Sequence, residues 1–315
     1  MKRVLVTGAR GFIGRHALVT LREQGFEIHA VTHGDPPAPP RDGSWQWHRA
    51  DLLDIAAIEP LVRRVRPTHL LHFAWDAVPG RYWTSLDNFA WVRASLELLR
   101  RFHECGGTRV VMAGTCAEYD WSYGYCYEGV TPTNPATTYG VCKLSMQRML
   151  QAYCAETGVS GAWGRIFFLY GPHEHPSRLV SSVVRSLLQG NLARCSPGTQ
   201  IRDFMHVQDV ADAFVSLLES AVTGPVNIGS GQPVTLREVI YQIAHGIGRS
   251  DLVRLGALPM SPSDPPLLCA DVRRLSSEVG WAPAYDLDHG LGDTVRWWRD
   301  ELSREAATAA QRMAQ

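Results

Sequence analysis

Three glycines near the start of the chain constrain its fold more than any other feature. Gly8, Gly11 and Gly14 directly follow the aliphatic run of residues 4–7. This run predicts a strand buried on both faces, and the glycines predict a tight turn from the strand into a helix. Such a helix directs unpaired N–H groups and the positive end of its dipole at a ligand in front of the turn. The turn therefore favours a diphosphate and, with it, a dinucleotide.

Strand and helix patterns alternate through the rest of the first half. Short aliphatic runs predict strands over residues 27–32, 45–49, 69–74, 109–114 and 161–168. Helical patterns lie between them, over residues 14–24, 55–65, 86–105 and 139–157. This alternation requires parallel strands with right-handed crossovers. We therefore expect an α/β fold in which residues 1–172 form a Rossmann-type, doubly wound parallel sheet.

The alternation loosens after Pro172. Helical patterns follow over residues 179–189, 208–220, 236–246 and 290–304, separated by connections rich in Gly and Pro. We expect a smaller C-terminal lobe over residues 173–305, with the chain free to cross between the two lobes. The alanine-rich tail, residues 306–315, either prolongs the last helix or frays.

Composition argues against several classes of partner. Lys+Arg and Asp+Glu number 31 each, so no global charge attracts nucleic acid or an anionic membrane. The seven cysteines are odd in number and form no C-x-x-C pair, which argues against a metal site or a disulfide framework and favours a reducing cytoplasm. No stretch is long and apolar enough to span a bilayer. We expect a small-molecule substrate.

The glycine turn belongs to a longer set of family-like motifs. The segment TGARGFIG closely resembles the fingerprint of extended short-chain dehydrogenase/reductases, chiefly nucleotide-sugar epimerases, dehydratases and reductases. Similar motifs recur at Tyr170-Gly171-Pro172, at residues 202–207 and 227–231, and at Gly280-Trp281. The resemblance covers nearly the whole chain and implies that the C-terminal lobe binds the substrate.

Tyr139 and Lys143 form the candidate catalytic pair. They are one helical turn apart, so both side chains can face the same way. A neighbouring ammonium stabilises a phenolate, so we expect Lys143 to lower the pKa of Tyr139. The resemblance implies that Thr115, at the end of a predicted strand, completes a catalytic triad by hydrogen-bonding the substrate oxygen. It also implies that Lys143 contacts the nicotinamide ribose.

The end of the second predicted strand favours NADP over NAD. An NAD-binding unit usually places an acid there, but this chain has Thr32-His33. Without the acid a 2′-phosphate is not repelled, and Arg10 can reach it. The alternative is that Asp35 turns back to serve NAD. The expected cofactor-binding residues are Gly8, Arg10, Gly11, Phe12, Ile13, Gly14, Thr32, His33, Asp51, Leu52, Phe73, Ala74, Tyr139 and Lys143.

The candidate substrate site departs from the family. Dehydratases place an Asp-Glu pair directly after the strand-end hydroxyl, whereas this chain has Cys116-Ala117, which disfavours dehydration. Trp91 and Phe168 replace two asparagines and imply an apolar sugar pocket. Arg202 corresponds to an arginine that grips the substrate diphosphate, and Arg178 falls near the position of a catalytic histidine in some relatives. The expected substrate-binding residues are Cys116, Phe168, Arg178 and Arg202.

Aromatic residues alternate directly after the strand that ends near Thr115. They are Tyr119, Trp121, Tyr123, Tyr125 and Tyr127. They either line the pocket or cover the core as an extended segment, and the sequence leaves both interpretations open.

Together these features predict NADPH-dependent reduction of a 4-keto-6-deoxysugar nucleotide. One alternative is a nucleotide-sugar 4-epimerase that retains NAD and uses the same triad. A second alternative is an NADP-sensing protein without catalysis. The resemblance also implies a homodimer formed through the helices predicted over residues 86–105 and 139–157.

Overall fold

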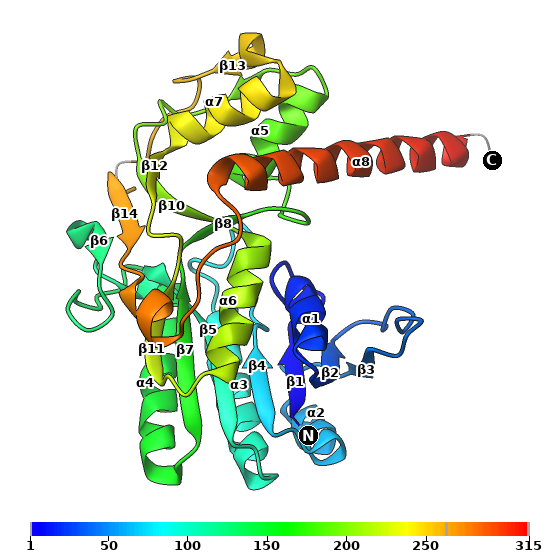
Figure 1. Ribbon diagram of the computed structural model, residues 1–315, viewed down its shortest axis with the longest axis vertical. Helices are drawn as coiled ribbons and strands as arrows, with labels where there is room; N and C mark the ends of the chain where they lie inside the picture. Colours follow the sequence, from blue (N-terminus) through cyan, green and yellow to red (C-terminus); the bar gives the residue numbers. More distant parts are fainter. Residues whose placement is uncertain (1, 262–263, 314–315) are drawn as a thin grey trace.

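The structure, a computed structural model, describes residues 2–261 and 264–313. Within these residues the largest element is a seven-stranded sheet in the order β11-β7-β5-β4-β1-β2-β3 (Figure 1). Its strands are β1 (Arg3–Thr7), β2 (Glu27–Thr32), β3 (Trp45–Arg49), β4 (His69–His72), β5 (Arg109–Thr115), β7 (Ser160–Ile166) and β11 (Gly224–Ile228). Every neighbouring pair is parallel. This confirms the Rossmann-type fold, with the strand order reversing between β1 and β4.

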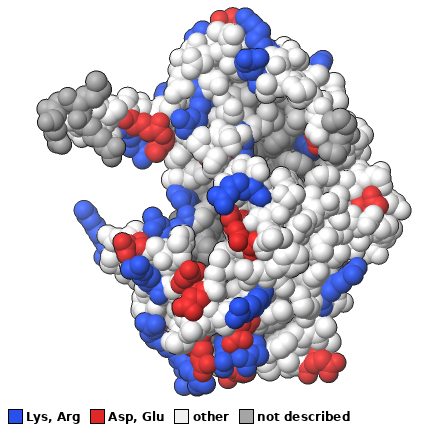
Figure 2. All heavy atoms as spheres, turned by 180° about the vertical axis from the view of Figure 1, so that it is seen from behind, with Lys and Arg blue, Asp and Glu red and all other residues white. Residues whose placement is uncertain are grey.

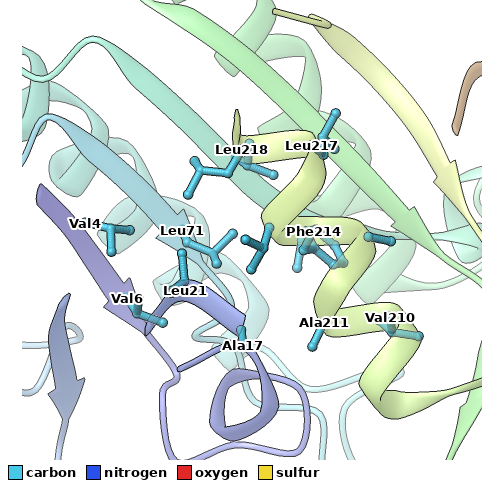
Figure 3. Close-up of a cluster of buried hydrophobic side chains, with 14 of the residues drawn as sticks. Val4, Val6, Ala17, Leu21, Leu71, Val210, Ala211, Phe214, Leu217 and Leu218 are labelled. Atoms are coloured by element: carbon cyan, nitrogen blue, oxygen red, sulfur yellow. The ribbon is translucent and has the colours of Figure 1, made fainter. Parts of the chain in front are cut away.

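Helices cover both faces of this sheet. Successive residues of a strand point to opposite faces, so Val4 and Val6 contact one layer of helices and Leu5 contacts the other. The first layer contains α1 (Gly14–Glu23) and α6 (Val207–Glu219), and the second contains α2 (Ile55–Val65), α3 (Asp87–Glu104) and α4 (Thr138–Thr157). Figure 3 shows the first layer, where Ala17 and Leu21 of α1 lie near Phe214 of α6.

The smaller lobe is built around a second sheet. Its strands are β12 (Pro233–Thr235), β10 (Ile201–His206), β14 (Leu267–Ala270) and β6 (Tyr125–Cys126), with β8 (Phe168–Tyr170) also paired to β10. A two-stranded sheet of β9 (Ala193–Arg194) and β13 (Val253–Arg254) accompanies it. The helices of this lobe are α5 (Leu179–Leu188), α7 (Leu236–Ile247) and the first part of α8 (Leu287–Met313). Val184, Ile240 and Trp298 form part of their buried core.

The chain crosses between the lobes more than once. Helix α6 and strand β11 follow Pro172 in the sequence, yet both belong to the larger lobe. Strand β11 is an edge strand of the seven-stranded sheet, and α6 packs on one face of that sheet. Strand β6 precedes Pro172 and pairs in the smaller sheet. No single point in the sequence therefore separates the two lobes.

The last helix continues into the alanine-rich tail. Helix α8 runs to Met313, and Figure 1 shows its second half extending away from the rest of the molecule. In the described part of the chain, no helix has both the length and the apolar character that crossing a membrane requires.

Candidate active site

The glycine turn packs closely against the end of β4. Gly8 has φ +66°, and a Cβ there would lie 2.8 Å from the Ala74 nitrogen and 2.9 Å from the Phe73 carbonyl carbon. A Cβ at Gly14 would collide with the Gly8 carbonyl group. Helix α1 starts after Ile13, whose apolar side chain makes no capping hydrogen bond to the first turn of the helix. The turn therefore keeps side chains away from the start of α1, where a dinucleotide site would hold a diphosphate.

The other expected cofactor residues follow the same edge of the sheet. Thr32 ends β2, His33 follows it, Asp51 and Leu52 follow β3, and Phe73 and Ala74 follow β4. All lie at the carboxyl ends of parallel strands next to the point where the strand order reverses, which is where such sheets bind ligands.

Arg10 and Asp35 lie together at this edge. Arg10 Nη1 donates to the Asp35 backbone oxygen at 3.0 Å, and Arg49 Nη1 lies 2.9 Å from the Asp35 carboxylate. Arg10 is therefore held by the loop that follows β2, and the same loop carries the exposed Asp35 carboxylate.

The structure brings the predicted triad together. Thr137 caps α4 by accepting a hydrogen bond from the Gly140 nitrogen at 3.1 Å, and Gly140 allows the helix to approach the Ala117 carbonyl. This start of α4 directs Tyr139 toward the end of β5, where its side chain is hydrogen-bonded to that of Thr115. Lys143, one turn later, donates from Nζ to the Ala113 oxygen at 2.8 Å.

The charge state of the triad differs from the expectation. Burial raises the pKa of Tyr139, and the hydrogen bond with Thr115 only partly opposes this. Burial lowers the pKa of Lys143 to about 7, against the effect of the Glu118 carboxylate. Lys143 Nζ lies 3.8 Å from the centre of the Trp75 ring and 5.9 Å from that of Tyr139. In the protein alone, the pKa of Tyr139 is therefore raised and not lowered, because burial outweighs the hydrogen bond with Thr115, and Lys143 Nζ lies closer to the Trp75 ring than to the Tyr139 ring.

Two of the expected substrate-binding residues lie next to the triad. Cys116 directly follows Thr115, and burial raises the pKa of its thiol. The Arg178 guanidinium is hydrogen-bonded to Tyr82, whose ring centre lies 4.8 Å from that of Tyr139.

The other two expected residues, Arg202 and Phe168, come from the smaller lobe. The Arg202 guanidinium lies 5.3 Å from the Phe168 ring centre, and its Nη2 is 2.5 Å from the Asp264 carboxylate. Arg202 also interacts electrostatically with Cys116. The fold therefore brings residues of the smaller lobe toward the end of β5.

Aromatic residues that the sequence analysis missed surround Tyr139. Tyr82 and Trp83 lie against its ring, at 4.8 and 5.8 Å between centres. Trp75 packs on Trp91 in a stacked arrangement, 6.2 Å between ring centres. Three of these aromatic residues lie close together in the sequence after the strand that ends at His72, and this clustering could have identified them.

The alternating aromatic stretch separates into different roles. Tyr119 is buried and donates from its hydroxyl to Asn227 Oδ1 at 2.7 Å. Trp121 donates to the Cys116 oxygen at 2.9 Å and its ring lies 6.2 Å from that of Trp83. Tyr123 is 58 % exposed. Neither open interpretation describes the whole stretch, because two short 3₁₀ helices, Cys116–Glu118 and Trp121–Tyr123, break the alternation.

Glu118 is the most buried charged residue beside the triad, with no exposed surface. Its carboxylate accepts a hydrogen bond from the Thr115 nitrogen at 2.9 Å, which forms a capping box with Thr115. The pattern Thr115-x-x-Glu118 is a recognised helix-start signal and could have identified this residue.

Figure 2 shows the face opposite to that of Figure 1, where the molecule is hollowed between the two lobes. Lys and Arg side chains lie along the edges of this hollow. Over the described ranges, no three His, Cys, Asp or Glu side chains are grouped as a metal site would need.

Comparison with known proteins shows the family of this chain. Residues 4–229 match the sequence model of the NAD dependent epimerase/dehydratase family. UDP-glucuronic acid decarboxylase 1 of Xenopus tropicalis is 28% identical over 97% of this chain and 74% of its own length. The UDP-glucose 4-epimerase of Thermus thermophilus, solved with NAD, has TM-score 0.80 and 27% identity over 94% of this chain and 99% of its own. MoeE5, solved with UDP-glucose and NAD, has TM-score 0.82 and 30% identity over 95% and 99%.

These comparisons correct the expected cofactor. The expectation of NADP is wrong, because similar solved structures, among them the Thermus thermophilus epimerase and MoeE5, hold NAD. The sequence argument relied on the missing acid at Thr32-His33. The structure shows an acid close to this strand end after all, because Asp35 follows β2 in the next loop, where Arg10 and Arg49 contact it.

Proposed function

Because this chain belongs to the NAD-dependent epimerase/dehydratase family, we propose that it is a nucleotide-sugar 4-epimerase that retains NAD throughout the reaction. The observation that carries this proposal is the meeting of Tyr139, Thr115 and Lys143 at the end of β5. An epimerase and a reductase need the same triad. They differ in whether the cofactor is consumed.

The residues after Thr115 argue against water elimination. Dehydratases of this family have an Asp-Glu pair there, and this chain has Cys116 and Ala117, both buried. Burial raises the pKa of the Cys116 thiol, so it stays protonated near neutral pH and does not act as a base. Tyr139 is left as the proton-transfer group at this strand end, which suits oxidation and reduction at one sugar carbon.

The glycine turn would hold the cofactor diphosphate at the start of α1, and Lys143 would hold the nicotinamide ribose. The chemistry that NAD supplies when bound is the acceptance and return of a hydride. As a phenolate, Tyr139 Oη would take the proton of the C4 hydroxyl during oxidation, and as the phenol so formed it would return this proton after the sugar has turned its other face. Thr115 Oγ1 donates a hydrogen bond to the same sugar oxygen and stabilises its developing negative charge.

The sequence analysis favours reduction of a 4-keto sugar with NADPH as the hydride donor. Net reduction consumes the cofactor, whereas an epimerase returns it unchanged. The correction to NAD therefore shifts the choice to the epimerase. The aromatic rings of Tyr82, Trp83 and Trp121 near Tyr139 favour a sugar that presents an apolar ring face.

Purified protein is expected to contain NAD and to interconvert 4-epimers of a nucleotide sugar without net change in NADH absorbance. We would incubate it with UDP-glucose, UDP-glucuronic acid and 6-deoxyhexose nucleotides and separate the products by anion-exchange chromatography. Binding of NADH is expected to be tighter than binding of NADPH. Product formed in step with NADH consumption would instead identify a reductase. NAD binding without any conversion would favour the non-catalytic alternative.

We also propose a homodimer formed through α3 and α4. Exposed apolar residues gather near the start of these helices: Leu86 is 76% exposed, Phe89 57% and Val141 45%. A charge in an apolar interface is costly, so Phe89→Glu is expected to give a monomer in light scattering after size-exclusion chromatography. Leu258→Glu, at another exposed leucine, is the control and should remain dimeric. A wild-type protein that is already monomeric would refute the proposal.

A further inference from the structure

A buried ion pair lies directly behind the triad. Glu118 follows the end of β5, and Arg165 stands on β7, the next strand of the sheet. Arg165 Nε lies 2.7 Å from Glu118 Oε2, and their side chains are 2% and 0% exposed. A buried pair of charges is costly to desolvate, and replacing it with apolar residues is often neutral or stabilising. The pair therefore calls for a role other than stability.

Glu118 holds the backbone of Thr115. Its Oε1 accepts from the Thr115 nitrogen at 2.9 Å and from Trp163 Nε1 at 2.8 Å. A Cβ on Gly114 would collide with the Trp163 indole and would lie 2.7 Å from Glu118 Oε1. The space beside Gly114 is thus filled by these two side chains. The hydroxyl of Thr115 is positioned by a strand end that the carboxylate fixes.

Glu118 also acts on the charge of Lys143. The titratable and charged groups around Lys143 are Tyr139 on its own helix, His72 on β4, and Glu118 with its partner Arg165. His72 contributes no charge near neutral pH, because burial lowers its pKa to about 3. The carboxylate of Glu118 favours the ammonium form of Lys143 and opposes the effect of burial.

We propose that Glu118, held in place by Arg165, is a positioning residue that fixes Thr115 and keeps Lys143 in its ammonium form. The inference rests on the proposed function, in which Lys143 donates to the nicotinamide ribose. An ammonium makes a stronger, charge-assisted hydrogen bond than a neutral amine. Glu118 thereby links the end of β5 to the binding of the cofactor.

The double variant Glu118→Gln/Arg165→Met tests this inference. The Gln amide oxygen can still accept from the Thr115 nitrogen and Trp163 Nε1, and Met fills the space of Arg165 without leaving an unpaired charge. NADH binding is measured by fluorescence from pH 6 to pH 10, because this readout does not depend on turnover. Affinity is expected to fall as Lys143 loses its proton. In the variant this fall should begin about one pH unit lower, which weakens binding about tenfold on the alkaline side.

Asp209→Asn is the matched control. Asp209 is a buried acid whose carboxylate accepts from the Ala284 and Tyr285 nitrogens, each at 3.0 Å, at the start of α6. This variant makes the same acid-to-amide change away from the triad. The pH at which its NADH affinity has half fallen, the midpoint, should equal that of the wild-type protein. An unchanged midpoint in the double variant would overturn the inference. A shifted midpoint in a protein that converts no nucleotide sugar would support it while refuting the proposed reaction.

Discussion

Tyr139→Phe is expected to reduce turnover about 10²- to 10⁴-fold, which is the usual contribution of a general acid–base group. The substitution removes the hydroxyl that meets Thr115 and leaves the aromatic ring among Tyr82 and Trp83. Folding and NAD binding should persist, because the ring still fills its site. The measurement is kcat for epimer formation, together with the NAD content of the purified variant.

The control for this substitution is Tyr153→Phe on the same helix. Tyr153 Oη lies 3.0 Å from His103 Nδ1, on the side of α4 that faces α3. Its loss is expected to leave kcat within about twofold, because it touches neither the triad nor the glycine turn. Full activity in Tyr139→Phe would show that proton transfer runs through another group.

Arg165→Met alone is expected to destabilise the protein by about 3–5 kcal/mol, because it leaves the Glu118 carboxylate buried without its partner. Glu118 has no exposed surface, so water cannot replace the guanidinium. The free energy of unfolding in urea, followed by circular dichroism, is the measurement. The double variant with Glu118→Gln should recover most of the loss, because it removes the unpaired charge.

An exposed ion pair provides the comparison for Arg165→Met. Arg100 pairs with Glu97 at 2.8 Å on the outer surface of α3, where both the charge and its replacement are solvated. Arg100→Met should leave the urea midpoint almost unchanged. If Arg165→Met were equally mild, the pairing with Arg165 would not be needed to hold Glu118 in place, and the role assigned to the pair would fail.

Features set by nearby residues could be predicted from the sequence. The glycine turn, the Tyr139–Lys143 spacing and the helix pattern depend on residues a few positions apart, and the structure places these elements as expected. The cofactor error has a different origin. Thr32-His33 lacks an acid, but the loop after β2 brings Asp35 to Arg10 and Arg49, and no local pattern shows how that loop turns.

The sequence by itself determined the sheet of alternating strands and helices, through its periodicity, and the family, through motifs that resemble those of known members; it also proposed the three residues of the triad. Only the tertiary structure decided that Glu118 meets Arg165, 47 residues away, and that Trp75 covers Lys143. Burial also set the charge states, with the pKa of Lys143 lowered to about 7. Desolvation depends on every segment packed around a side chain, and the order of residues along the chain does not record that packing.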